Sequence, residues 1–415
     1  MENNTQLKEM IRSMVIDILQ GQKQETASSQ PVKQVSRGQE PGVFDTVDEA
    51  IRAAKEAQLR FEDCTLATRE KVIADIRAAM RPRVQELAQK TVEETGMGRV
   101  ADKVLKLNLT LDKTPGVEDL VTECETGDNG MTLYELSAYG VIGAITPSTN
   151  PAETLICNSI GMLAAGNAIF FSVHPGAKNL SRELVSELNQ VIAKSIGIEN
   201  LIVTLREPSI ESAQEMMLHP DVSLLVVTGG PGVVKQALQS GKKVIGAGAG
   251  NPPAFVDETA DIKKAAQDIV LGASLDNNIL CIAEKSVVAM RQIEPQLVQE
   301  MVKVGCVLVD NQQDIQRLVD LTVLPNGTPN KQFVGKNAGV ILDAAHIPYN
   351  GDPRLIILRT PKDHPFAVIE MLMPILPVIT VDSFEEGLNV CLMLEAGLHH
   401  TATMHSLNME RLNQM

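Results

Sequence analysis

One cysteine has the sequence surroundings of a nucleophile. Cys281 lies in the segment Ser274 to Lys285, SLDNNILCIAEK, between a helical pattern and a β-rich run, Ser286 to Met290. On such a connector a thiolate can accept hydrogen bonds from loop N–H groups and still be reached by a substrate. The alternative is a buried structural thiol, since free cysteine is among the most buried residue types.

A candidate oxyanion donor lies in the segment Thr146 to Pro151, which reads TPSTNP. The apolar run before it predicts a strand and the pattern after it predicts a helix. An asparagine amide on such a turn can donate to a developing oxyanion, and Pro151 stiffens the turn. Cys281 and Asn150 are therefore the candidate catalytic residues.

Two glycine-rich segments are candidates for a phosphate-binding turn. Thr228 to Gly232, TGGPG, follows a predicted strand and opens a helix, where free N–H groups and the helix dipole favour an anion. A plain turn fits this pattern equally well. Gly246 to Gly250, GAGAG, lacks the G-x-G-x-x-G spacing and runs into two prolines, so it is a weak signal for a dinucleotide-binding turn.

The elements that position these segments alternate between strand and helix. Apolar runs predict strands at Gly140 to Thr146, Ala168 to Val173, Leu201 to Leu205 and Leu224 to Thr228. Helical patterns begin near Ala152, Gly176 and Ser209. Strands without polar alternation, linked by helices, predict a parallel sheet covered on both faces, which binds ligands at the carboxyl ends of its strands.

A second α/β unit is predicted after Pro253. The strand Ala254 to Val256 leads into a helix from Asp261 to Ala273, which delivers the Cys281 segment. Further strands are predicted at Cys306 to Val309, Leu355 to Leu358 and Pro377 to Val381, with helices at Glu294 to Gly305 and Phe384 to Glu395. The chain is thus expected to be α/β, with domains at 43–252 and 253–415.

The first twenty residues form a separate element. Apolar residues recur there at helical spacing, at Leu7, Met10, Ile11, Met14, Val15 and Ile18. A linker at 21–42, rich in Gln, Ser, Lys and Gly, has no periodicity that could bury a core. The stripe predicts docking on a partner surface or packing on the chain's own domain, and the lack of a basic polar face disfavours a membrane.

The composition narrows the function classes. The chain of 415 residues has a net charge of −15 and only 3% aromatic residues, with no Trp. This charge opposes nucleic acid and anionic membranes, so a small molecule is the favoured partner. The six cysteines are scattered, which predicts a reducing, cytoplasmic setting and no zinc site.

Two other features are interpreted as structural. The apolar run Leu155 to Val173 is interrupted by polar residues and glycines, so we expect a buried helix, a turn and a buried strand there, not a membrane span. His399 and His405 would share a face of a strand, but without a nearby carboxylate or cysteine a metal site is disfavoured.

The order of motifs resembles the aldehyde dehydrogenase superfamily. TPSTNP, TGGPG, GAGAGNPP, NNILCIAEK and EMLMPILPV follow one another along the chain. The detailed match is to the CoA-acylating branch, the propionaldehyde and acetaldehyde dehydrogenases of bacterial microcompartments. ETGMG, DKTPGVEDL, SGKKVIGAGAGNPP and EAGLHHTATMHS look like the propionaldehyde group of propanediol utilisation in particular. The resemblance covers essentially the whole chain.

The resemblance implies an aldehyde dehydrogenase-like fold, with a Rossmann-type cofactor domain and an α/β catalytic domain. It places Cys281 at the nucleophile, Asn150 at the oxyanion position and Glu370 at the nicotinamide ribose of NAD. It further implies that the cofactor cleft is lined by Thr146, Pro147, Ser172, His174, Thr228, Gly229 and Gly232. His174 stands where hydrolytic relatives carry a lysine.

The sequence departs from the family pattern in two places. Hydrolytic relatives have a glutamate base, and the matching residues here are Gly248 to Gly250. Water needs a base to attack an acyl-enzyme, whereas a CoA thiol is acidic enough to attack as thiolate, so thiolysis is favoured. Family members also continue beyond Met415, so the catalytic domain is expected to be shortened.

Several alternatives remain open on these grounds. The leading hypothesis is oxidation of propionaldehyde or a similar aldehyde with NAD and CoA, through a Cys281 thioester. Acetaldehyde preference, a hydrolytic enzyme and a non-catalytic shell-binding form are the alternatives. The resemblance also implies that residues 1–20 dock on a microcompartment shell protein, and that a region near 120–140 contributes to a homo-oligomer.

Overall fold

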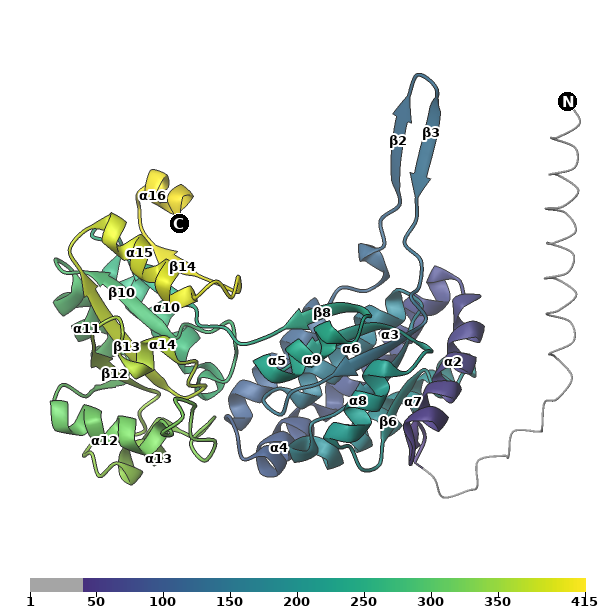
Figure 1. The fold of residues 1–415 in the computed structure, drawn as a ribbon, viewed down its shortest axis with the longest axis horizontal. Coiled ribbons are helices and arrows are strands. Elements are labelled where there is room, and N and C mark those ends of the chain that lie inside the picture. Colours follow the sequence, from purple (N-terminus) through teal and green to yellow (C-terminus); the bar gives the residue numbers. More distant parts are fainter. Residues whose placement is uncertain (1–39) are drawn as a thin grey trace, which may run out of the picture. The chain divides into compact units, whose positions relative to one another are not determined.

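Two six-stranded sheets form the framework of the computed structural model, which describes residues 40–415 (Figure 1). Every strand pair within these two sheets is parallel. The predicted α/β class with parallel sheets is therefore confirmed. The predicted helix at 1–20 and nearly all of the predicted linker lie outside the described residues.

The first sheet has the strand order β1-β6-β5-β4-β7-β8. Its strands are β1 (Val43–Phe44), β4 (Val141–Ile145), β5 (Ala168–Ser172), β6 (Ile202–Leu205), β7 (Val222–Thr228) and β8 (Lys243–Ala247). Strands β4 to β6 advance in one direction, whereas β7 and β8 lie on the other side of β4. A reversal of this kind opens a crevice at the carboxyl ends of the strands.

Helices cover this sheet and form one core with it. They are α2 (Val47–Glu62), α3 (Leu66–Met80), α4 (Val84–Thr95), α5 (Val100–Lys113), α6 (Pro151–Ala164), α7 (Lys178–Ile196), α8 (Ile210–Leu218) and α9 (Pro231–Gln239). Every residue of β4, β5 and β6 is buried, as their unbroken apolar runs predict. The run Leu155 to Val173 consists of the end of α6, a turn and β5, which confirms its prediction as a buried helix and strand.

The second sheet has the order β11-β12-β13-β10-β9-β14. Its strands are β9 (Pro253–Val256), β10 (Ser286–Met290), β11 (Cys306–Leu308), β12 (Leu355–Arg359), β13 (Ile375–Val381) and β14 (Thr403–His405). The helices that accompany it are α10 (Ile262–Ser274), α11 (Glu294–Lys303), α12 (Gln312–Thr322), α13 (Ala338–Ala344), α14 (Pro365–Val368), α15 (Phe384–Glu395) and α16 (Met409–Gln414). Asp261 caps α10 by accepting a hydrogen bond from Lys264 N at 3.1 Å.

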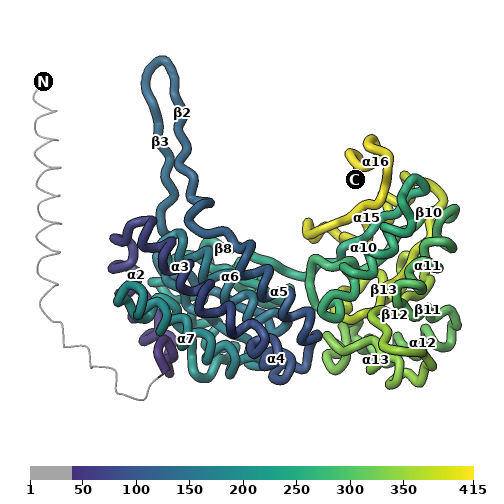
Figure 2. The backbone as a smooth tube through the Cα atoms, turned by 180° about the vertical axis from the view of Figure 1, so that it is seen from behind, coloured from purple at the N-terminus to yellow at the C-terminus, as the bar shows by residue number. Residues whose placement is uncertain are grey.

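Several elements of the structure were not predicted, including two formed by strands. Strands β2 (Glu123–Gly127) and β3 (Gly130–Tyr134) form an antiparallel hairpin whose residues are all exposed, and it extends away from the first sheet (Figures 1 and 2). The other is β8, which contains Gly246. The GAGAG segment begins inside a strand and leads to β9, so it opens no helix. This agrees with the prediction that it is a weak signal for a dinucleotide-binding turn.

One expectation about the histidines is wrong. His405 ends β14, but His399 lies outside the strand with a left-handed φ of 52°, so the two do not share a strand face. Among residues 40–415 no three His, Cys, Asp or Glu side chains are grouped closely enough to hold a metal ion. No helix in this part of the chain is long and apolar enough to cross a membrane.

Candidate active site

The candidate cofactor residues gather at the carboxyl ends of neighbouring strands in the first sheet. Thr146 follows β4, Ser172 ends β5 and Thr228 ends β7, and these strands are adjacent in the order β5-β4-β7. This is the edge at which the strand order reverses. The Thr146 hydroxyl is buried and has no hydrogen-bond partner among the described residues, so the edge fits a polar ligand such as a dinucleotide.

Pro147 and His174 lie at the same edge, just after β4 and β5. His174 Nδ1 accepts a hydrogen bond from Gly176 N at 3.0 Å. Burial lowers the pKa of His174, and the nearby charge of Lys331 lowers it further. The imidazole is therefore neutral at pH 7 and brings no fixed cation to this edge of the sheet.

The turn between β7 and α9 has the features of an anion site. Gly230 is the N-cap of α9 and supplies no side-chain hydrogen bond to the first N–H groups of the helix. A Cβ on Gly229 would lie 2.8 Å from Val233 Cγ1, so a side chain there would force Val233 to move. A Cβ on Gly232 would meet nothing within 4 Å, which leaves open space over the turn. The turn thus fits a pyrophosphate.

Cys281 lies on a loop between α10 and β10, as predicted, and we call residues 275–285 the cysteine loop. Asp276, Asn277 and Asn278 are buried and have left-handed φ angles of 51°, 57° and 65°. This conformation costs a non-glycine residue about 1 kcal/mol or more, and Asn and Asp tolerate it best. The amide groups of Asn277 and Asn278 each donate two hydrogen bonds to surrounding oxygens, which holds the loop.

The ionisation of Cys281 is subject to opposing effects. Burial of the thiol, together with the Glu370 carboxylate, raises the pKa of Cys281, while Lys285 and backbone N–H groups oppose this rise. The Lys285 ammonium is buried under the cysteine loop and donates to Asn278 O at 2.8 Å, Asn278 Oδ1 at 2.6 Å and Leu280 O at 2.8 Å. Burial lowers the pKa of Lys285 to about 8, so the ammonium form still predominates at pH 7.

Gly250 lies between the cysteine loop and two titratable side chains. Its N–H donates to Glu370 Oε1 at 3.1 Å. A Cβ on Gly250 would lie 2.7 Å from the Cys281 carbonyl oxygen and 2.9 Å from Cγ of His400, so no side chain fits there. Burial raises the pKa of Glu370, an effect opposed by the Gly250 N–H and by the nearby Lys285 and His400.

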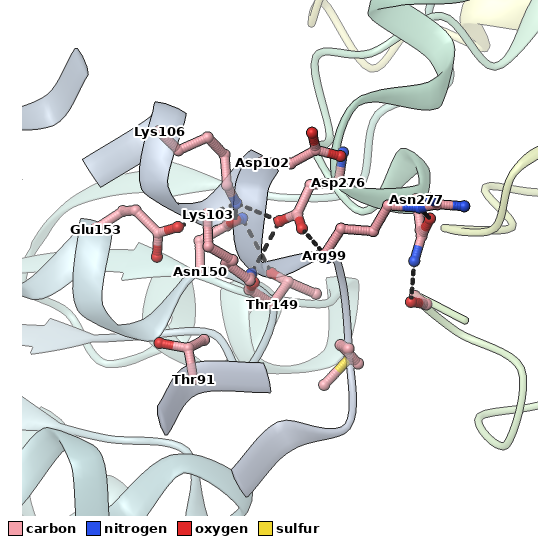
Figure 3. A network of polar contacts seen from close by, with 12 residues as sticks. Thr91, Arg99, Asp102, Lys103, Lys106, Thr149, Asn150, Glu153, Asp276 and Asn277 are labelled. Atoms are coloured by element: carbon pink, nitrogen blue, oxygen red, sulfur yellow. Dashed lines mark hydrogen bonds and ion pairs between the residues drawn. The ribbon is translucent and has the colours of Figure 1, made fainter. Parts of the chain in front are cut away.

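Asn150 is the N-cap of α6 and lies beside a buried group of charged side chains (Figure 3). Its Oδ1 accepts a hydrogen bond from Lys106 Nζ, and its Nδ2 donates to Thr149 Oγ1 at 3.3 Å. Lys106 Nζ also pairs with Asp276 Oδ2 at 2.5 Å. Asn150 is thereby connected to the loop that carries Cys281.

The candidate residues lie in two groups, and Asn150 is connected to the loop of Cys281 through other side chains. One group lies along the edge of the first sheet, and the other joins Cys281 and Glu370 around Gly250. Among the described residues no hydrogen bond joins Asn150 directly to Cys281, and the link runs through Lys106 and Asp276. The sequence did not single out the residues that surround both catalytic candidates, which are Lys103, Lys106, Asp276 and Lys285.

Comparison with known proteins finds similar sequences. A sequence model of the aldehyde dehydrogenase family matches residues 20–328. The chain is 47% identical to the CoA-propanoylating propanal dehydrogenase of Citrobacter freundii, over 99% of this chain and 86% of that protein.

Solved structures are similar as well. The propionaldehyde dehydrogenase of Rhodopseudomonas palustris, with bound CoA and an acylated cysteine, is 45% identical with a TM-score of 0.88, over 90% of this chain and 85% of that one. A propionaldehyde dehydrogenase from the fucose utilisation microcompartment of Clostridium phytofermentans has the same identity and TM-score, over 90% of this chain and 86% of that one.

Proposed function

This chain belongs to the aldehyde dehydrogenase family, and we propose that it oxidises propionaldehyde with NAD⁺ and CoA to propionyl-CoA and NADH. The carrying observation is the segment Gly248 to Gly250, which has no side chain that could act as a general base, and at Gly250 the backbone lies so close to the Cys281 carbonyl and to His400 that no side chain fits. An acyl group on Cys281 is then better suited to attack by a thiolate than by water. The similarity to a CoA-propanoylating relative supports the choice of aldehyde.

The chemistry follows from the proposed roles of the residues. The Cys281 thiolate adds to the aldehyde carbonyl, and the Asn150 amide with the Cys281 N–H stabilises the oxyanion. The edge of the first sheet and Glu370 would hold NAD⁺, which would accept the hydride. Loss of hydride leaves a thioester on Cys281. The CoA thiol gives up its proton to water, its sulfur attacks the thioester carbonyl, and the bond to Cys281 Sγ breaks to regenerate the thiolate.

Product analysis tests thiolysis against hydrolysis. With propionaldehyde, NAD⁺ and CoA, we expect propionyl-CoA and NADH in equal amounts. Without CoA, NADH should stop near one equivalent per subunit, because the thioester persists. Repeated turnover to free propionate without CoA would support the hydrolytic alternative. Rates with aldehydes of two to four carbons would decide between acetaldehyde and propionaldehyde.

We propose further that the N-terminal residues bring the enzyme into a bacterial microcompartment. Support comes from the apolar stripe in residues 1–20 and from the similarity to a microcompartment enzyme. A chain that starts at Pro41 should keep its activity and lose association with shell protein, as measured by co-purification. Ile11→Glu should have the same effect, whereas Arg12→Glu, off the stripe, should not. Association that survives the truncation would refute the proposal.

The β2–β3 hairpin is the proposed contribution of residues near 120–140 to a homo-oligomer. Met131, Leu133 and Tyr134 are 71%, 58% and 49% exposed. Apolar side chains gathered on an exposed hairpin favour contact with another protein surface, and a second copy of this chain is the proposed partner.

A further inference from the structure

Two buried lysines of α5 lie between the start of α6 and the cysteine loop (Figure 3). Lys103 and Lys106 are one helical turn apart and are 0% and 7% exposed. Lys103 Nζ donates to Thr149 O at 2.6 Å and pairs with Asp276 Oδ2 at 2.9 Å. Lys106 Nζ contacts the same Asp276 oxygen and the side-chain oxygen of Asn150. The Asp276 carboxylate of the cysteine loop therefore pairs with both lysines. The same lysines also contact Thr149 and Asn150, in the turn before α6.

The charges in this group are balanced. Glu153, in the first turn of α6, places Oε1 3.2 Å from Lys106 Nζ, so two ammonium groups face two carboxylates. Burying an unpaired charge costs several kcal/mol, and this pairing avoids much of that cost. Burial opposes the charge on Lys106, but Glu153 and Asp276 outweigh it and raise the pKa of the lysine. Lys106 is therefore a cation throughout the physiological pH range.

Lys106 decides which way the Asn150 amide is oriented. A lysine ammonium has donors only, so the amide atom that it contacts is the oxygen. The amide nitrogen then faces away from Lys106, and one of its two hydrogens is directed to Thr149 Oγ1. The other hydrogen remains available to a ligand. A cation at the amide oxygen also polarises the amide and strengthens its N–H as a donor.

We propose that Lys106 is a positioning residue, which holds the Asn150 amide as a donor to the oxyanion formed when Cys281 adds to the aldehyde. Asp276 is the counter-ion that keeps this donor in register with the cysteine loop. The inference rests on the proposed function, in which Asn150 and Cys281 act on the aldehyde. Lys106 keeps its proton and touches no substrate.

The test must remove the Lys106 contact without leaving an unpaired buried charge. Lys106→Met combined with Glu153→Gln does so, because Lys103 and Asp276 remain as a balanced pair. Four full-length chains are compared: wild type, Asn150→Ala, the Lys106→Met/Glu153→Gln pair, and all three substitutions together. Lys113→Met, an exposed lysine on α5, is the control.

We expect Asn150→Ala to lower kcat/KM for the aldehyde by about 100-fold, as for loss of one oxyanion donor. The pair should lower it by a similar factor, through kcat with little change in KM, and the triple variant should be no worse than Asn150→Ala. Lys106→Gln in the same Glu153→Gln background retains a donor and should recover part of the loss. The Lys113→Met control should stay close to wild type.

A structural role would give a different pattern. Losses that multiply in the triple variant, or a pair variant close to wild type, would overturn the inference. The rate at which iodoacetamide alkylates Cys281 should be unchanged in the pair, because Lys106 acts on the oxyanion and not on the thiol; a changed rate would show a disturbed cysteine loop instead. Mass spectrometry of wild type with aldehyde and NAD⁺ distinguishes failure of this inference from failure of the proposed function. Absence of a Cys281 adduct in that experiment would refute the proposed function itself.

Discussion

Cys281→Ser is expected to reduce NADH formation by roughly 10⁴-fold or more, because a serine hydroxyl without a strong base is far less ionised than a thiol. The variant should keep its fold, since the substitution exchanges one small side chain for another at a partly buried position. The measurement is NADH absorbance with propionaldehyde and CoA, together with the mass of the protein after reaction without CoA. Wild type should gain one acyl group on the peptide that contains Cys281, and the variant none.

Cys157→Ser is the matched control for this substitution. Cys157 is an exposed cysteine on α6 and has no role in the proposed reaction. Its replacement should leave both the NADH rate and the acyl adduct at the wild-type level. Cofactor binding should be the same in all three proteins, as measured by the rise in melting temperature when the nucleotide is added. Turnover that survives in Cys281→Ser would remove this residue from the reaction.

The sequence could predict the elements whose signal is local. The buried strands β4 and β5 are unbroken apolar runs, and they follow from hydrophobicity alone. The Cys281 loop and the turn at Thr228 to Gly232 could also be placed, because each lies where one clear pattern gives way to another. The β2–β3 hairpin was missed because an exposed strand pair has no buried face, and the alternation in Met131-Thr132-Leu133 is too short to predict a strand.

The charged surroundings of the site could not be predicted from local patterns. Lys103 and Lys106, three residues apart on a helix, look like part of a solvated face, and their partner Asp276 lies far away along the chain. The left-handed run of Asp276, Asn277 and Asn278 is compatible with residues that tolerate this conformation, but long-range hydrogen bonds select it. Burial of a lysine depends on a partner that only the folded chain supplies.

Lys285→Met is expected to lower the free energy of unfolding strongly, although it leaves every proposed catalytic residue in place. Lys285 is 3% exposed, and methionine matches the length of its apolar stem. The loss of the ammonium leaves three oxygens, on Asn278 and Leu280, without the donor that each has now. Each unsatisfied buried acceptor costs about 1–3 kcal/mol, and relief from burying a charge offsets part of the total. We therefore expect the variant to lose about 2–4 kcal/mol of unfolding free energy, measured by urea denaturation.

The same substitution should change the pH dependence of the cysteine. Lys285 is a cation that opposes the rise in the pKa of Cys281, so its removal should raise that pKa further. The rate of alkylation by iodoacetamide should still be increasing at pH 9.0 in wild type, and the variant's profile should be displaced to higher pH. Lys303→Met replaces an exposed lysine of α11 and should alter neither the profile nor the stability.

The stability difference between the two proteins should itself depend on pH. The pKa of Lys285 is about 8 in the folded chain, against 10.5 for an ordinary lysine. Below pH 8 both states carry the proton and the cost of burying the charge is fully present. Between these values the unfolded chain binds more protons than the folded chain, so folding stability rises with pH. The stability advantage of wild type over Lys285→Met should thus grow from pH 8 to 10.5, and a difference that is constant or shrinks would show that the ammonium is not buried under the cysteine loop.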